Sequence, residues 1–179
     1  DKKQKERGTE RKWRNRNVLK KIYAKSRKDI SCEGMGTTLV VAVVYKDDAI
    51  IANVGDSRCY LLKGDNFRKI TKDHSVVEEL VSANLITEEE ARVHPRRNQI
   101  TRAMGAEEII IVDIFREKLE KNDMLVLATD GLTGCVEDKD IKRIIMQDKS
   151  IKDICDDLIN EANNNSGKDN ISVILTKID

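Results

Sequence analysis

The feature that most limits the fold is a block of short apolar runs, broken at intervals by small groups of turn-forming residues. It reads TTLVVAVVYKDDAIIANVGDSRCYLLKGDNFRKIT and spans residues 37–71. The breaks are Asp47-Asp48, Gly55-Asp56 and Gly64-Asp65-Asn66. The β-branched residues that dominate the runs favour extended backbone, and breaks this short leave room only for tight turns. We therefore predict antiparallel hairpins, with strands near 38–46, 49–54, 57–63 and 67–71.

Helical patterns fill much of the rest of the chain. Two capping-box patterns, Ser75 with Glu78 and Thr87 with Glu90, each precede a predicted helix, and Pro95 ends the second one. Further helices are predicted at 17–28, at 137–147 and after Ser150, and further strands at 108–118, 123–129 and 171–178. Hairpins segregated from helices predict an α+β class, with antiparallel sheets covered by helices. A parallel doubly wound sheet is disfavoured, because the early strands lack crossover helices.

The chain's charge is balanced overall but uneven along its length. Its 179 residues fit one domain, and a net charge of +1 gives no global drive toward nucleic acid or membrane. Residues 1–16 carry eight basic and three acidic residues, or +5, which leaves −4 for the remainder. We predict a basic lead-in at 1–16, solvated or disordered, and a folded domain at 17–179. A contact of the lead-in with nucleic acid or anionic lipid is weakly supported, because Trp13 is the only aromatic ring there that could stack on a base.

Cysteine usage and hydropathy bear on the compartment. The four cysteines form no CxxC pair and only two histidines accompany them, so a structural zinc site is disfavoured. Free thiols in apolar segments predict a reducing setting. No stretch approaches the roughly 20 apolar residues that span a bilayer, and no signal peptide is visible. We predict a cytoplasmic protein. Its first residue is Asp rather than Met, which is compatible with a fragment.

Three acids are candidates for metal binding. Asp130 ends the apolar run MLVLATD, and a carboxylate there needs a cation, hydrogen bonds or a proton. Asp169 directly precedes the last apolar strand, so the two carboxylates could meet at one sheet edge if their strands are neighbours. Mg²⁺ and Mn²⁺ take few carboxylates plus water. The alternatives are turn roles for Asp130 and Asp169, and a helix-capping role for Asp73, the third candidate.

Other polar motifs are weaker. Arg96 and Arg97 in HPRRN lie in a solvated loop or contact a phosphorylated substrate, since Arg binds phosphate with two hydrogen bonds. NVGDSR indicates a hairpin turn with a local ion pair of Asp56 and Arg58. GMGTT at 34–38 lacks the lysine and the following helix of a phosphate-binding P-loop. No serine or cysteine has the setting of a nucleophile with its base.

In order along the chain, six segments resemble the metal-dependent protein serine/threonine phosphatases of type 2C, particularly the bacterial branch. They are GMGTT, ANVGDSRCYLL, ITKDHSVVEELV, LITEEEARVHPRRNQITRAMG, LATDGLTG and GKDNISVIL. The resemblance runs from about Val18 to the C-terminus. It implies a four-layer αββα fold, in which helices flank a sandwich of two antiparallel sheets, and a site for two or three Mn²⁺ or Mg²⁺ ions.

The same resemblance implies roles for the candidate residues. Asp130 corresponds to the acid that bridges metals, Asp169 to a ligand near the last strand, and Asp73 to a ligand of the third metal. A metal-activated water would hydrolyse phosphoserine or phosphothreonine without a phosphoenzyme. The segment 75–104 resembles a flap beside the site, and it holds Arg96 and Arg97. Phosphorylated proteins are the implied substrates and a serine/threonine protein kinase the implied partner, with no nucleic acid or membrane and a monomeric state.

One departure from the family affects function. The family begins with two strands that carry an Arg or other phosphate-binding residue and a paired acid motif, and an Asp-Gly-x-Gly-Gly motif follows them. Neither motif is found in this chain. We expect a missing N-terminal part, and hence poor activity for these 179 residues alone. The alternative is a non-catalytic, phosphatase-like binding or regulatory module. An unrelated α+β binding domain with a basic arm is disfavoured by the six ordered segments.

Overall fold

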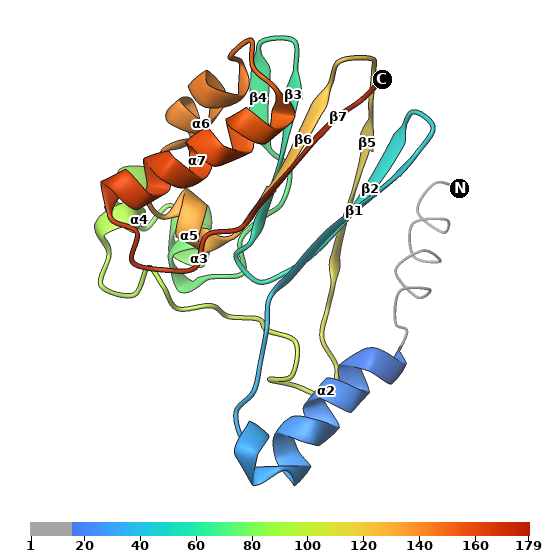
Figure 1. Ribbon diagram of the computed structural model, residues 1–179. Coiled ribbons are helices and arrows are strands. Elements are labelled where there is room, and N and C mark those ends of the chain that lie inside the picture. The colour runs from blue at the N-terminus through green and yellow to red at the C-terminus, as the bar shows by residue number, and fades with distance from the viewer. Residues whose placement is uncertain (1–15) are drawn as a thin grey trace.

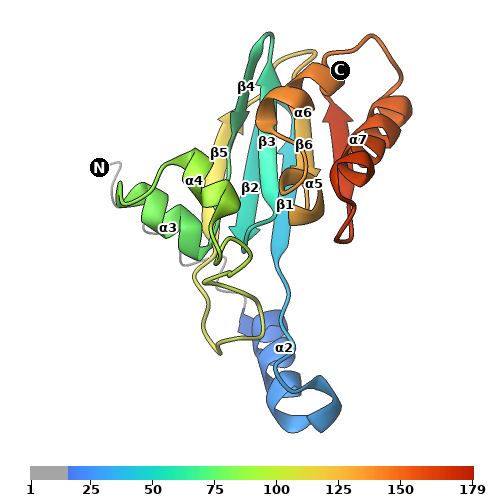
Figure 2. The same cartoon turned by 90° about the vertical axis from the view of Figure 1, so that its left-hand side faces the viewer.

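Two antiparallel sheets form the centre of the molecule. The structure is a computed structural model that describes residues 16–179, with side chains from Lys20 onward. The first sheet has the order β1-β2-β5 and contains β1 (Leu39–Tyr45), β2 (Asp48–Val54) and β5 (Asp113–Lys118). The second has the order β4-β3-β6-β7 and contains β3 (Arg58–Lys63), β4 (Asn66–Lys69), β6 (Met124–Ala128) and β7 (Val173–Lys177). Every strand pair is antiparallel, and the two sheets lie face to face (Figures 1 and 2).

Tight turns join two of the predicted hairpins. Tyr45 pairs with Asp48 across a two-residue loop in which Lys46 has φ 55°, and Lys63 pairs with Asn66 across a loop in which Gly64 has φ 54°. Two-residue loops of this kind match the twist of the strands they join. The hairpin predicted at Gly55-Asp56 is wrong, because β2 and β3 belong to different sheets. The chain crosses from one sheet to the other at this turn.

The helices are α2 (Arg16–Lys28), α3 (Val76–Ser82), α4 (Glu88–Val93), α5 (Asp130–Thr133), α6 (Asp138–Ile145) and α7 (Ile151–Asn165), with a 3₁₀ turn η1 (Ile30–Cys32). Three of these helices, α3, α4 and α7, begin directly after the residues predicted to cap them. Ser75 accepts a hydrogen bond from the Glu78 N–H, Thr87 and Glu90 make a complete capping box, and Ser150 accepts from Asp153 N–H. The predicted lead-in lies outside the described residues except for Arg16, which begins α2.

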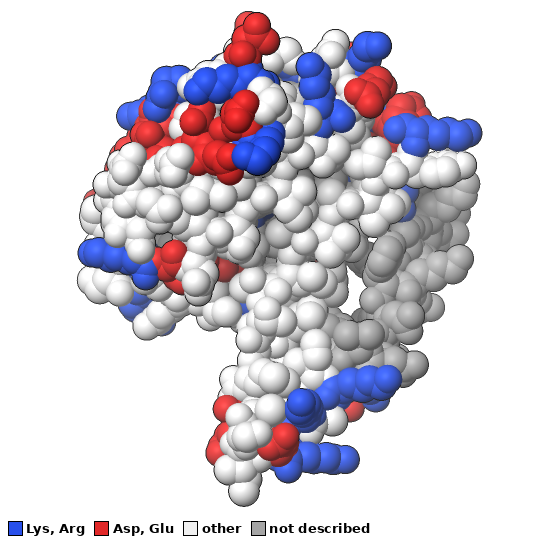
Figure 3. Space-filling model, viewed as in Figure 1, with Lys and Arg blue, Asp and Glu red and all other residues white. Residues whose placement is uncertain are grey.

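The core has two parts. One lies between the two sheets and includes Ile51, Leu61 and Leu125. The other lies between the four-stranded sheet and the helices α6 and α7, where Ile141 and Leu158 are fully buried. Outward-facing charges cover α6 and α7, with basic side chains beside acidic ones (Figure 3). The predicted α+β sandwich with flanking helices is therefore confirmed.

Some details differ from the prediction. The strand expected at 108–118 begins only at Asp113, because its partner β2 ends at Val54 and leaves the preceding residues without a neighbour. Ile109 and Ile111 are exposed as a result. No described helix covers the outer face of the three-stranded sheet, where Tyr45 is exposed. In residues 16–179 we find no helix of the length and apolarity that crossing a membrane requires.

Candidate functional site

The segments that carry Asp130 and Asp169 meet at one edge of the four-stranded sheet. The end of β6 pairs with the start of β7, with Ala128 opposite Val173. Just beyond, Thr129 N–H donates to the Ser172 carbonyl at 3.1 Å, and the Ser172 N–H donates to Thr129 Oγ1 at 3.0 Å. The neighbouring strands assumed in the prediction are therefore present. Both carboxylates are exposed, and each accepts a hydrogen bond from the N–H of the residue that follows it.

Close packing holds these two segments together. Thr129 is the N-cap of α5, and Asp130 is its first residue. Gly131, next in the chain, is buried against the loop that follows Asp169, and a Cβ at this position would overlap the carbonyl oxygen of Asn170. The Asp-Gly pair is thus more than a turn, since only glycine lets α5 approach this loop so closely.

Asp73 is held by an arginine. Arg58 Nη2 donates to Asp73 Oδ2 at 2.7 Å, and Arg58 Nε lies 3.1 and 2.9 Å from the two oxygens. Lys69 Nζ lies 3.6 Å from Asp73 Oδ1. The Asp73 side chain is 7% exposed, so this fork occupies most of its acceptor capacity. The local ion pair expected between Arg58 and Asp56 is wrong, because Arg58 reaches across to Asp73 instead.

The Arg58 network continues to α6. Arg58 Nη1 donates to the Tyr60 hydroxyl at 3.1 Å, and the hydroxyl donates to Asp138 Oδ1, also at 3.1 Å. Tyr60 is fully buried in β3, and Asp138 begins α6. The network therefore anchors Asp73 to the four-stranded sheet and to the first turn of α6.

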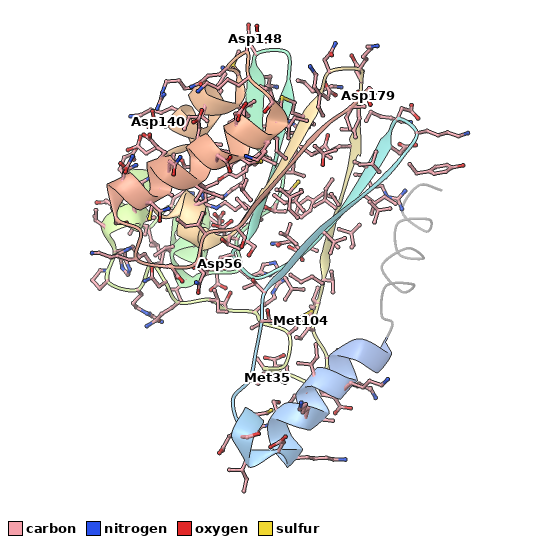
Figure 4. All side chains as sticks on the ribbon, in the orientation of Figure 1. Met35, Asp56, Met104, Asp140, Asp148 and Asp179 are labelled. Carbon is pink, nitrogen blue, oxygen red and sulfur yellow. The ribbon has the colours of Figure 1, made fainter. Side chains whose placement is uncertain are left out.

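Asp56 is an acid that the sequence did not single out as a candidate. It lies in the turn between β2 and β3, near the lower end of the sheets in Figure 4. Partial burial and the negative charge of Asp130 raise the pKa of Asp56 to about 6, with a smaller contribution from Asp73. The structure thus brings Asp56 close to two of the predicted ligands. We call Asp56, Asp73, Asp130 and Asp169 the acidic site.

The acidic site has the type of donor atom that a divalent metal prefers, but too few donors lie close together to hold one. Its oxygen donors are those that Mg²⁺ and Mn²⁺ prefer. In the part of the chain that the structure describes, no three His, Cys, Asp or Glu side chains are grouped closely enough to hold a metal ion. Asp73 is also engaged by Arg58. The described residues therefore supply part of a metal site.

The arginines of the flap-like segment lie in different settings. Arg96 and Arg97 are exposed in the loop after α4, where Arg96 Nε donates to Gln99 Oε1 at 2.7 Å. Their predicted contact with a substrate stays a prediction. Arg102, which the sequence did not single out, is partly buried and donates to Asp113 Oδ1 at 3.0 Å. The sequence could not predict the contact between Arg102 and Asp113, because Asp113 is the first residue of β5 and its position depends on where that strand begins.

The raised pKa of Asp56 leads to a stability prediction. Between its ordinary value of 3.8 and about 6, the folded protein holds a proton that the unfolded chain has released, so stability falls as the pH rises through this window. After allowance for solvent screening, we expect Asp56→Asn to be more stable than the parent by about 1 kcal/mol at neutral pH without divalent ions. Urea unfolding at acid and neutral pH measures this difference.

The matched control is Asp65→Asn, which changes an exposed turn acid between β3 and β4. It should alter stability by less than about 0.5 kcal/mol at either pH. An Asp56→Asn protein that is less stable than the parent at neutral pH would contradict the assigned environment.

Comparisons with known proteins identify the family of this chain. The sequence profile of a family described as Protein phosphatase 2C matches residues 2–108. The serine/threonine phosphatase Stp of Listeria welshimeri is 42% identical over 156 residues, which are 87% of this chain and 61% of that protein. The crystal structure of the serine/threonine phosphatase Stp1 from Staphylococcus aureus has a TM-score of 0.89 at 40% identity, covering 92% of this chain and 65% of that one.

A further solved structure holds metal. It is the catalytic domain of the serine threonine protein phosphatase PstP in complex with two manganese ions, with a TM-score of 0.82 at 29% identity over 92% of this chain and 68% of that one. This chain spans less than two thirds of the length of the curated relatives that it matches, 61% in the case of the Listeria welshimeri protein. The family profile, the identity to bacterial relatives and the shared fold lead to one conclusion: this chain belongs to the protein phosphatase 2C family.

Proposed function

We propose that this chain is the larger part of a metal-dependent protein phosphatase that hydrolyses phosphoserine and phosphothreonine. The observation that carries the proposal is the meeting of the Asp130 and Asp169 segments at one sheet edge, with Asp56 beside Asp130. In this role Asp130 and Asp169 hold Mn²⁺ or Mg²⁺, and Asp73 holds a third ion once it is released from Arg58. A bound metal would lower the pKa of a coordinated water and neutralise phosphoryl charge.

The chain's own residues account for the rest of the site. Gly131 keeps the two ligand-bearing segments in contact, and Arg58 keeps Asp73 in place when no metal is bound. Arg96 and Arg97, exposed on the loop after α4, are proposed to contact the phosphorylated protein substrate, since Arg forms paired hydrogen bonds to phosphate. The proposed setting is the cytoplasm, with a serine/threonine protein kinase as partner and a monomeric state.

The incomplete donor set supports a second expectation, that these 179 residues turn over slowly by themselves. The test compares this chain with a hybrid that adds the part of the Listeria welshimeri relative outside the match, using a phosphothreonine peptide with and without Mn²⁺. We expect Mn²⁺-dependent hydrolysis by the hybrid and background rates for its Asp130→Asn variant, provided that both fold by circular dichroism. A folded hybrid that stays inactive with Mn²⁺ and Mg²⁺, or an Asp130→Asn variant with full activity, would refute the proposal.

The engagement of Asp73 by Arg58 favours one alternative, a non-catalytic phosphatase-like binding or regulatory module. Such a module would bind the phosphothreonine peptide without hydrolysing it, and its binding would not depend on Mn²⁺. Rapid, metal-dependent turnover by the 179 residues alone would exclude this alternative and would also refute the expectation of an incomplete site.

A further inference from the structure

Three side chains make a polar cluster behind the turn between β2 and β3, and the proposed hydrolysis gives none of them a role. His74 Nε2 lies 3.1 Å from Asp113 Oδ2 and 3.0 Å from Arg102 Nη1. Arg102 Nη1 also donates to Asp113 Oδ1 at 3.0 Å, which closes the triangle. His74 is 4% exposed, so these contacts are shielded from solvent on the histidine side. We call His74, Arg102 and Asp113 the histidine clasp.

The other side of the imidazole ring holds Gly55. The Gly55 N–H donates to His74 Nδ1 at 3.0 Å, and the His74 N–H donates to the Gly55 carbonyl at 2.9 Å. Because Nδ1 accepts a hydrogen bond, a neutral ring carries its proton on Nε2 and donates it to Asp113. One residue therefore satisfies both backbone groups of Gly55, and Asp113 fixes the orientation of the ring.

Gly55 cannot easily move to another conformation. Its φ is +106°, and a Cβ here would overlap Thr38 Cγ2, so the backbone passes directly against the residue before β1. Asn53 Nδ2 adds a hydrogen bond to the Gly55 carbonyl at 3.2 Å. Asp56 comes next in the chain, and the register of β3 with β6, in which Arg58 pairs with Ala128, brings it toward Asp130. The position of the Asp56 carboxylate thus follows from how firmly Gly55 is held.

The clasp also closes the base of the flap-like segment. The chain leaves at Ser75 and returns at Ile100, and these two residues form an isolated bridge. The Thr101 N–H donates to the His74 carbonyl at 2.7 Å, and Arg102 follows directly. Both stems of the segment between Ser75 and Ile100 are therefore bonded to the same residue that holds Gly55.

We propose that His74 is a positioning residue that fixes Gly55, and through it the Asp56 carboxylate, at the acidic site, and that Asp113 and Arg102 tie this position to the base of the segment 75–100. The consequence for metal binding rests on the proposed phosphatase function. The negative charge of Asp56 beside Asp130 attracts a cation only while the turn holds it there. The tie to the segment's base would transmit a displacement of that segment to the acidic site.

Two substitutions of His74 test the two ring nitrogens separately, because each one keeps the contact of one nitrogen and removes that of the other. The side-chain oxygen of His74→Asn lies near the place of Nδ1, where it can accept from Gly55, but the shorter side chain does not reach Asp113. The longer side chain of His74→Gln reaches toward Asp113 and leaves the Gly55 N–H without its acceptor. The first measurement is amide hydrogen exchange at Gly55 by NMR without metal. We expect exchange in the Gln variant to be about tenfold faster than in the parent, and in the Asn variant to be within about threefold, the effect of one hydrogen bond.

The second measurement is Mn²⁺ affinity, from the free ion signal in electron paramagnetic resonance, with the parent and both variants carried in the hybrid that adds the part of the Listeria welshimeri relative outside the match. We expect the Gln variant to bind Mn²⁺ about tenfold more weakly than the parent and the Asn variant to stay within about threefold. If His74 were merely structural, both variants would lose Mn²⁺ affinity to a similar extent, and that result would overturn the proposal. Equal exchange at Gly55 in both variants would overturn it as well. Absence of Mn²⁺ binding by the parent, with the expected exchange pattern, would refute the proposed function and support the positioning of Gly55.

Discussion

Replacing Arg58 by Met will destabilise the protein by about 3 kcal/mol or more, because it leaves Asp73 buried without its main counter-charge. Asp73 is 7% exposed, and the remaining cation, Lys69, lies 3.6 Å away. The substitution also removes the donor that faces the Tyr60 hydroxyl. Methionine keeps much of the apolar stem of arginine, so the loss of charge and hydrogen bonds dominates. Urea unfolding followed by circular dichroism gives the change in free energy of unfolding.

A less buried pair elsewhere in the structure provides the control. Arg68 pairs with Glu117 between the edges of the two sheets, and their side chains are 43% and 18% exposed, against 22% for Arg58 and 7% for Asp73. We expect Arg68→Met to cost less than about 1 kcal/mol. A second variant, Arg58→Met with Asp73→Leu, should recover most of the lost stability, because it removes the uncompensated carboxylate together with its partner. Equal losses for Arg58→Met and Arg68→Met would show that the Asp73 pair is no more buried than a surface pair.

The Arg58 pair also illustrates what the sequence could and could not predict. Asp56 lies two residues from Arg58, which made a local ion pair the simplest interpretation, but strand geometry decided otherwise. The turn at Gly55 carries the chain from one sheet to the other. Arg58, on the second sheet, then pairs with Asp73, which lies 15 residues further along the chain. Local spacing cannot reveal a change of sheet, because both strands have the same apolar composition.

Caps and strand adjacency were more predictable, since they depend on short patterns. Ser75, Thr87 and Ser150 cap the helices that follow them. For Ser75 and Thr87 the spacing to a glutamate three residues on predicts this role. The meeting of the Asp130 and Asp169 segments was predicted only on the condition that their strands are neighbours, and the pairing of β6 with β7 meets that condition. The histidine clasp could not be found in this way. Its members come from positions 74, 102 and 113, and only the start of β5 beside β2 brings Asp113 to His74.

The second large effect is expected for Gly131→Ala. A Cβ at Gly131 would overlap the carbonyl oxygen of Asn170 and lie 3.3 Å from Ile171 Cα, and both are backbone atoms that cannot turn aside. Either α5 or the loop after Asp169 must move. We expect a loss of about 1–3 kcal/mol in the free energy of unfolding, as for other overpacked sites, even though alanine favours helix. Amide chemical shifts of Asp169 and Asn170 should change most, because the new methyl group on α5 contacts this loop.

Gly36→Ala is the matched control for this glycine. A Cβ there would lie 3.4 Å from the Met104 carbonyl oxygen and 3.5 Å from Ala103 Cβ, which are ordinary contacts. We expect it to change stability by less than about 0.5 kcal/mol and to leave the Asp169 amide unchanged. Equal stability losses in the two variants, or an unshifted Asp169 amide in Gly131→Ala, would contradict the close approach of α5 to this loop. The expected pattern would show that Gly131 holds Asp130 and Asp169 within reach of one another, a requirement for any cation that binds both.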